Sequence, residues 1–161
     1  MINILLECVN EEDIKYEEMI LKAAQAVLEC ENHTFDAEIS VTLTNNEEIR
    51  KINSEHRGID KETDVLSFPL YDFDVPSVFS EKQVLIDGDV RVLGDIVISV
   101  EKIIEQAKEY DHSTKREMSY MTVHSMLHLL GYDHLDEGPQ KKQMRQREEE
   151  IAAKIARMQR D

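Results

Sequence analysis

The stretch from residue 113 to residue 134 reads STKREMSYMTVHSMLHLLGYDH and predicts a long helix with two defined ends. Ser113 or Thr114 suits its N-cap, because a hydroxyl oxygen there can accept a hydrogen bond from the backbone of the first turn. Gly131 suits the position just after the helix, where the chain enters the left-handed region that glycine tolerates. We therefore expect one helix to run from about residue 114 to Gly131 and to lie centrally in the fold.

Strand patterns precede this helix. Runs of branched apolar residues predict strands over residues 2–9, 37–43, 64–68 and 95–99. Asp87-Gly88 predicts a hairpin that joins residues 84–86 to residues 90–92. Because the order of elements is mixed, with about four strands among helices, we expect a single sheet in an α+β fold.

Helical spacing of apolar residues predicts four further helices, over residues 12–30, 45–58, 100–110 and about 138–158. Asn45 and Ser99 are the expected N-caps of the second and third of these. Ile14 is expected on the buried face of the first. A chain of 161 residues suffices for one domain with a core. We therefore predict a single domain over residues 1–161, with one mostly four-stranded sheet packed by about five helices.

The net charge of the chain is strongly negative, at −15. Taken alone, this argues against a nucleic-acid partner, since Lys and Arg drive phosphate binding. Residues 139–161 differ, because they carry seven basic residues against four acidic ones, a balance of +3. This basic segment has a plain interpretation as a solvated helix face with ion pairs between neighbouring turns.

Nothing in the sequence suggests export or membrane insertion. The first residues lack a basic segment, and Glu7 interrupts their apolar run. The longest stretch without a formal charge, residues 118–132, is too short to span a bilayer. We expect a cytoplasmic protein without a membrane partner, whose Cys8 and Cys30 are reduced thiols.

Three histidines near the end of the central helix form a candidate metal site. His124 and His128 are four residues apart, so they project from the same helix face. His134 follows the turn at Gly131 and can return to the same point. Three imidazoles leave one position of a tetrahedral zinc ion open, as in catalytic sites. We therefore predict one Zn²⁺ per chain at the end of the central helix. The alternatives are a set of unrelated histidines, or another metal that imidazole suits, such as Cu, Fe or Ni.

The histidine spacing also fits the metzincin peptidase pattern, in which a glutamate follows the first histidine as general base. Here that position is Ser125, which cannot act as a base. Peptidase activity by the usual route is therefore disfavoured.

The sequence resembles the YbeY-type family of zinc-dependent endoribonucleases in three ordered blocks. The family's HGxLHLxGYDH motif matches the histidine segment from His124 to His134, with Ser125 in place of the usual glycine. Residues 57–69, RGIDKETDVLSFP, are similar to its RGxDxxTDVLSFP segment, and residues 94–99, GDIVIS, are similar to its LGDIxIS strand.

This resemblance implies a hydrolase that cleaves single-stranded RNA in ribosomal RNA processing, including 16S rRNA maturation, and in ribosome quality control. RNA and the ribosome or ribosomal proteins are the partners it implies, and no DNA partner is expected. The family's functional arginine falls at Arg57, whose planar fork suits phosphate oxygens. From the residues alone, an ion pair of Arg57 with Asp60 or Glu62 is the alternative.

Other positions in these blocks have less specific roles. Thr63, Asp64 and Ser67 are interpreted as turn and strand geometry that positions Arg57. Asp133 either orients a ligand imidazole or caps the turn after Gly131. Lys61 is either part of the phosphate-binding field or a solvated side chain. His33, His56 and His112 are not expected to be ligands.

The sequence leaves the nucleophile open, because no general base is evident. Either zinc-activated water or the RNA 2′-OH attacks the phosphodiester, and only the second route leaves a 2′,3′-cyclic phosphate. Two other functions remain as alternatives: a zinc metallopeptidase-like hydrolase, and a non-catalytic ribosome assembly factor whose acidic surface meets a basic ribosomal protein.

Overall fold

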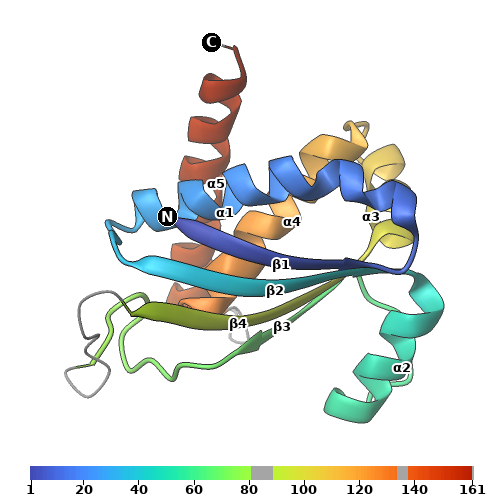
Figure 1. Cartoon of the computed structure of the whole chain (residues 1–161), viewed down its shortest axis with the longest axis horizontal. Coiled ribbons are helices and arrows are strands. Elements are labelled where there is room, and N and C mark those ends of the chain that lie inside the picture. Colours follow the sequence, from blue (N-terminus) through green and yellow to red (C-terminus); the bar gives the residue numbers. More distant parts are fainter. Residues whose placement is uncertain (81–88, 134–137, 161) are drawn as a thin grey trace.

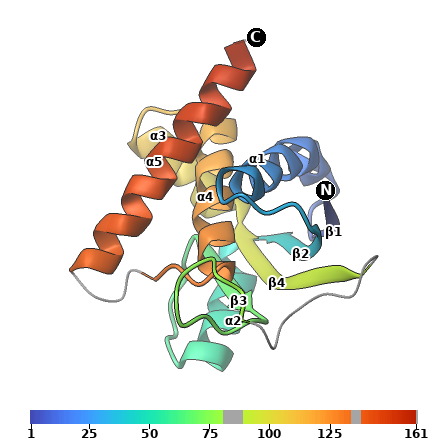
Figure 2. The ribbon, with the colours of Figure 1, turned by 90° about the vertical axis from the view of Figure 1, so that its left-hand side faces the viewer.

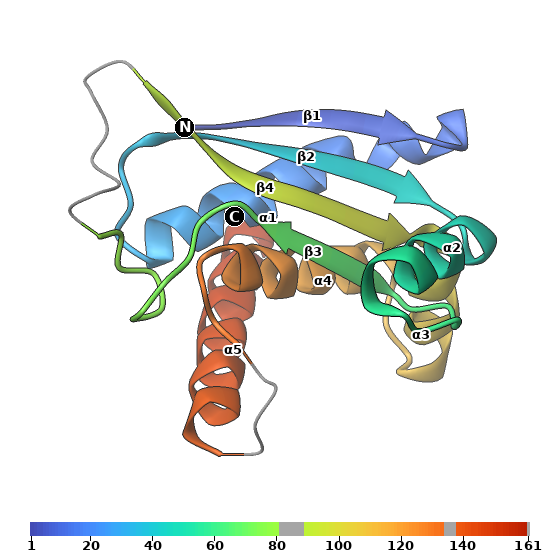
Figure 3. The same cartoon turned by 90° about the horizontal axis from the view of Figure 1, so that it is seen from below.

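The computed structural model describes residues 1–80, 89–133 and 138–160. In this part of the chain, four strands form one sheet. They are β1 (Ile2–Cys8), β2 (Asp36–Thr44), β3 (Val65–Pro69) and β4 (Val90–Ser99). The strand order is β1-β2-β4-β3, with β1, β2 and β4 parallel and β3 antiparallel to β4. Figure 3 shows this order from below, with β1 at one edge and β3 at the other.

Five α-helices and a short 3-10 helix accompany the sheet in the described residues. They are η1 (Glu11–Tyr16), α1 (Glu17–Cys30), α2 (Asn46–Arg57), α3 (Val100–Glu109), α4 (Thr114–Leu129) and α5 (Pro139–Arg160). The expected α+β class, with a four-stranded sheet and five helices, is therefore confirmed. None of the described helices is long and apolar enough to cross a membrane.

The helices divide between the two faces of the sheet (Figure 1). α1 and α4 cover one face, and α5 lies outside α4. The main core fills this layer with fully buried side chains such as Ile39, Leu43, Met126 and Leu127. α2 lies on the opposite side at one end of the sheet, where Ile49 packs with Leu66 and Val97 in a second, smaller cluster.

Local capping signals place the helices as expected. The side chains of Asn45, Ser99 and Ser113 each accept a hydrogen bond from the backbone N–H three residues ahead. A side-chain oxygen at this position satisfies a donor that the first turn leaves without a helical partner. Ser113, rather than Thr114, is thus the N-cap of α4.

The beginning of the first predicted helix differs from the expectation. Residues 11–16 form a 3-10 turn, and the α-helix starts only at Glu17. In a 3-10 turn, residues three apart lie on the same side, and here Asp13 and Tyr16 face inward. The expectation that Ile14 lies on the buried face was wrong, because 62% of its surface is exposed.

The strands expected at residues 90–92 and 95–99 are one strand, β4. In its register with β2, Val92 lies opposite Glu38 and Gly94 opposite Ile39, so Leu93 is an extra residue in a bulge. Gly94 has a φ of +148°, and a Cβ there would lie 2.3 Å from the carbonyl oxygen of Phe68. The glycine therefore bends a continuous strand. The expected partner strand at 84–86 and the Asp87-Gly88 turn lie outside the described residues.

Candidate functional site

α4 brings His124 and His128 together on one face. Their rings are nearly perpendicular, with centroids 4.6 Å apart, and their Nε2 atoms are 3.1 Å apart. Two nitrogen ligands of a tetrahedral zinc ion, each at ~2.0–2.1 Å from the metal, lie about 3.3 Å apart. The helical spacing has therefore placed two imidazole nitrogens as a shared metal ion requires.

The other ring nitrogen of each histidine faces an acceptor. Nδ1 of His128 donates to the carbonyl oxygen of Tyr132 at 2.9 Å, and Nδ1 of His124 donates to Oε1 of Glu148 at 2.5 Å. These partners assign the proton of each neutral ring to Nδ1 and leave a lone pair on Nε2. Histidine ligands of zinc are commonly oriented in this way by a carboxylate or a carbonyl. The chemistry of the pair thus fits a metal ion.

Glu148 is a buried carboxylate that α5 contributes to the site. Only 5% of its surface is exposed. Its second oxygen, Oε2, accepts a hydrogen bond from the Tyr120 hydroxyl at 2.6 Å. Burial favours a raised pKa for Glu148, but the hydrogen bonds from His124 and Tyr120 outweigh it, so the pKa lies below its usual value. Glu148 is therefore charged near neutral pH and stabilises the Nδ1 proton of His124.

A second contact of α5 supports the turn that bonds to His128. Arg147 donates to Glu31, at the end of α1, at 2.6 Å. Burial and a hydrogen bond to the same Glu31 raise the pKa of Tyr132 to about 12. The Tyr132 side chain is thus held between α1 and α5, and its backbone carbonyl is held against His128.

Gly131 ends the histidine helix as expected. Its φ is +95°, and a Cβ there would lie 2.6 Å from two atoms of the Phe73 side chain. The neighbouring Leu130 carbonyl accepts a hydrogen bond from the Ser77 N–H at 2.7 Å. Glycine is therefore required both by the backbone conformation and by the close packing of the 70–80 segment.

His134, the third expected ligand, lies outside the described residues. Within residues 1–80, 89–133 and 138–160, no group of three or more His, Cys, Asp or Glu side chains is placed to hold a metal ion. The metal ligation by His124, His128 and His134 therefore stays a prediction. It is supported at the first two positions by the geometry above.

Ser125, which follows the first histidine, is fully buried in α4, and its hydroxyl lacks a hydrogen-bond partner in the described structure. It therefore points into the core rather than toward the histidine pair. This placement agrees with the argument that no peptidase-type base occupies this position.

A cleft opens beside His124. Its volume is about 320 Å³, and it lies between α4, α5 and the residue that precedes β3. The lining side chains are Asp64, Tyr120, Met121, His124, Lys141, Met144, Arg145 and Glu148. A ligand in this cleft would contact His124 directly.

Arg57 is the last residue of α2, and its side chain is exposed. Its Nη1 donates a long hydrogen bond of 3.5 Å to Asn53. The ion pairs considered for it from the sequence form with other cations: Asp60 pairs with Arg50 at 2.8 Å, and Glu62 pairs with Lys102 at 2.6 Å. The guanidinium group of Arg57 is therefore presented to solvent at the end of the helix.

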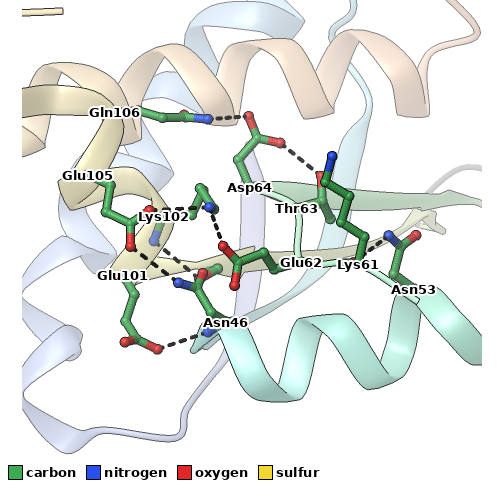
Figure 4. A network of polar contacts seen from close by, with 11 residues as sticks. Asn46, Asn53, Lys61, Glu62, Thr63, Asp64, Glu101, Lys102, Glu105 and Gln106 are labelled. Carbon is green, nitrogen blue, oxygen red and sulfur yellow. Dashed lines mark hydrogen bonds and ion pairs between the residues drawn. The ribbon is translucent and has the colours of Figure 1, made fainter. Parts of the chain in front are cut away.

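The segment after Arg57 is fixed by polar contacts to α2 and α3 (Figure 4). Asn53 donates to the Lys61 carbonyl at 2.8 Å, Lys102 binds Glu62, and Gln106 donates to Asp64 at 3.2 Å. The Thr63 hydroxyl and the Val65 N–H also donate to Asp64. These contacts fix the loop around Thr63 and Asp64. The predicted role of Thr63, Asp64 and Ser67 in positioning Arg57 stays a prediction.

The remaining histidines have other surroundings. His33 bonds to Ser77 at 2.7 Å, and the rings of His56 and His112 lie against Phe68 and Tyr110. Asp133 is half-buried directly after Tyr132. Whether Asp133 orients a ligand imidazole or caps the turn stays open. Whether the exposed Lys61 belongs to the phosphate-binding field or is only solvated stays open as well.

The sequence interpretation missed Glu148 and Tyr120. A signal for Glu148 was present, because Met144, Ile151 and Ile155 form an apolar stripe on α5 and residue 148 falls on the same face. A glutamate in such a stripe must meet a partner in the interior.

Comparison with known proteins identifies the family. The family model described as "Endoribonuclease YbeY" matches residues 6–156 of this chain. The chain belongs to the endoribonuclease YbeY family. The expected class of enzyme, a hydrolase that acts on RNA, is thereby confirmed.

Relatives in the YbeY family are similar over most of their length. "Endoribonuclease YbeY" of Thermoanaerobacter sp. (strain X514) is 48% identical over 159 residues, which cover 95% of this chain and 97% of the relative. The protein of the same name from Clostridium botulinum (strain Alaska E43 / Type E3) is 51% identical over 137 residues, or 81% of this chain and 82% of that one. The solution structure of TM1509 from Thermotoga maritima superposes with a TM-score of 0.64 at 27% identity, covering 99% of this chain and 92% of that one.

Proposed function

We propose that this YbeY-family protein is a zinc-dependent endoribonuclease that cleaves single-stranded RNA during ribosomal RNA maturation in the cytoplasm. His124, His128 and His134 would hold one zinc ion per chain. The observation that carries the proposal is the pair of Nε2 atoms 3.1 Å apart, while both Nδ1 atoms donate to Glu148 and the Tyr132 carbonyl. Three neutral imidazoles leave a tetrahedral ion one open position, which a catalytic role requires.

A bound zinc ion would supply a Lewis acid for a phosphoryl oxygen and would lower the pKa of a water molecule. The chain's own residues position the groups around it. Glu148 keeps the proton of His124 on Nδ1, and the Tyr132 carbonyl does the same for His128. Both rings therefore present Nε2 toward the same point.

Arg57 is the proposed phosphate-binding and charge-stabilising residue. Its guanidinium is exposed, and the nearby Asp60 and Glu62 are engaged by Arg50 and Lys102. A planar guanidinium can donate two parallel hydrogen bonds to phosphate oxygens and can stabilise the charge that develops during cleavage.

The strongly negative chain also suits a protein partner. With a net charge of −15, the chain as a whole repels RNA and attracts basic proteins. We propose that the enzyme works at the ribosome, where a basic ribosomal protein contacts the acidic surface. A non-catalytic assembly role would use the same contact, so the two roles differ only in whether RNA is cut. A zinc peptidase activity is disfavoured, because Ser125 stands at the position of the peptidase general base. Serine cannot act as that base, and here it is also buried in the core.

The test is a comparison of labelled single-stranded and fully paired RNA as substrates of zinc-loaded protein and of protein stripped with a chelator. We expect cleavage of the single strand by the zinc-loaded protein only, and restoration when zinc is returned. The chemical ends of the products then separate the two routes, because a 2′,3′-cyclic phosphate indicates attack by the 2′-OH. Cleavage of neither RNA by a protein that carries zinc would contradict the proposal and favour the assembly role.

A further inference from the structure

The basic C-terminal segment is divided between two sides of α5. Figure 2 shows α5 crossing α4. On one side, Arg147 binds Glu31 at 2.6 Å, and Lys154 lies 3.6 Å from Glu29, so both cations pair with the end of α1. On another side, Lys141 and Arg145 line the cleft beside His124. The prediction of a solvated helix face with ion pairs between neighbouring turns therefore does not describe the side of α5 that lines the cleft.

Lys141 and Arg145 are one helical turn apart, so their side chains leave α5 from neighbouring positions, with Cβ atoms ~5–6 Å apart. Lys141 is half-buried and Arg145 is exposed. Neither hydrogen bonds nor ion pairs engage Arg145 within the described part of the chain. Its guanidinium is thus available to a ligand that enters the cleft.

The two carboxylates of the cleft are already satisfied by the protein. Asp64 accepts hydrogen bonds from the Thr63 hydroxyl, the Val65 N–H and the Gln106 amide. Glu148 accepts from His124 and Tyr120. These hydrogen bonds direct both carboxylates toward donors of the protein, although both keep their negative charge. Lys141 and Arg145 are the positively charged donors among the lining residues that an incoming anion would meet.

We propose that Lys141 and Arg145 form a phosphate-binding subsite on the α5 wall of the cleft, which takes an RNA backbone phosphate next to the one that is cut. The inference rests on the proposed function, since it places this phosphate beside His124. The cleft volume of about 320 Å³ admits a short part of an RNA strand rather than a duplex. The subsite gives an acidic protein a local basic contact for its substrate, and it favours single strands.

The experiment measures equilibrium binding of a short, fluorescently labelled single-stranded RNA to the zinc-loaded full-length protein. The RNA is 2′-O-methylated to block attack by the 2′-OH. The variant is Lys141→Ala/Arg145→Ala. The matched control is Lys142→Ala/Arg157→Ala, which removes the same charge from exposed positions of α5 that do not line the cleft. The single variant Arg145→Ala is measured as well. Arg145 is exposed, so this variant should fold and keeps the test valid if the double variant does not fold.

We expect the cleft variant to weaken RNA binding by about tenfold and Arg145→Ala by about threefold, while the control stays within about twofold of wild type. Between about 50 and 200 mM salt, the slope of log affinity against log salt should fall by about 0.7 for each phosphate that a variant no longer binds. Zinc content should be unchanged in all variants. Equal weakening by the cleft variant and the control would overturn the subsite, as would weakening by neither.

These binding measurements, together with cleavage of the same RNA without the 2′-O-methyl groups by wild type, separate the subsite from the proposed function. If wild type binds and cleaves RNA but the cleft variant behaves like the control, the subsite is wrong and the function stands. If wild type binds RNA through the subsite but cuts none, the proposed nuclease function fails and the subsite stands. Absence of any RNA binding by wild type would contradict both.

Discussion

Glu148 of α5 accepts a 2.5 Å hydrogen bond from Nδ1 of His124 in α4, and this contact makes the C-terminal helix part of the candidate metal site. The carboxylate is buried, and the Tyr120 hydroxyl holds its other oxygen at 2.6 Å. The position of a proposed zinc ligand therefore depends on a helix that lies beyond the histidine motif.

Replacement of Glu148 tests this dependence through metal affinity. We expect Glu148→Ala to weaken zinc binding by ~10–100-fold, because it removes the acceptor that fixes the Nδ1 proton of His124. Glu148→Gln keeps an oxygen acceptor of the same length and should stay close to wild type. The measurement is a zinc titration against a chromophoric chelator. Equal losses of affinity in the two variants would show that Glu148 acts only by its charge, and no loss would show that it does not orient the ligand.

Gly131 should be sensitive to the smallest side chain. Gly131→Ala requires a positive φ of +95° and places a Cβ 2.6 Å from Phe73. We expect it to lower the free energy of unfolding by ~2–4 kcal/mol, from backbone strain and overpacking together. Urea unfolding of metal-free protein gives this value.

Gly58→Ala is the matched control for this substitution. Gly58 also has a positive φ, +68°, but a Cβ there meets no atom within 4 Å. Only the backbone cost of ~1–2 kcal/mol should remain. Equal destabilisation by the two alanines would contradict the role of the Phe73 contact.

His33 should make stability depend on pH. Burial lowers its pKa below the ordinary 6.5, and the charge of Arg91 acts in the same direction against that of Glu31. The unfolded chain therefore binds this proton more readily than the folded protein. The stabilising contribution is present above pH 6.5 and is lost as the pH falls through the lowered pKa.

The His33→Gln variant removes this titration. Its free energy of unfolding should fall less than that of wild type between about pH 7.5 and pH 5.5, the range in which histidine changes charge. Urea unfolding at the two pH values provides the comparison, on metal-free protein, because zinc release has its own pH dependence. Identical decreases in wild type and variant would refute the assignment to His33.

Features encoded by neighbouring residues could be predicted from the sequence. The N-caps Asn45, Ser99 and Ser113 and the turn at Gly131 each depend on a few adjacent positions. The pair of His124 and His128 follows in the same way from helical periodicity.

Features that depend on distant segments could not be predicted in this way. The continuity of β4 through Gly94 is set by the approach of the Phe68 carbonyl and by the register with β2. The 3-10 turn over residues 11–16 buries Asp13 and Tyr16 and leaves Ile14 exposed, against the α-helical spacing of its sequence. The Glu148 contact joins residues 24 apart, on two helices whose crossing no local pattern encodes.

The central claim is that zinc at the histidine site and Arg57 act together in RNA cleavage. The most direct measurement is cleavage of single-stranded RNA by wild type, His124→Ala and Arg57→Ala, with zinc content determined in the same samples. We predict about one zinc per wild-type chain and cleavage by wild type alone, with zinc absent from His124→Ala but kept in the exposed-site variant Arg57→Ala. Cleavage that survives in both variants, or a fully zinc-loaded wild type without activity, would contradict it.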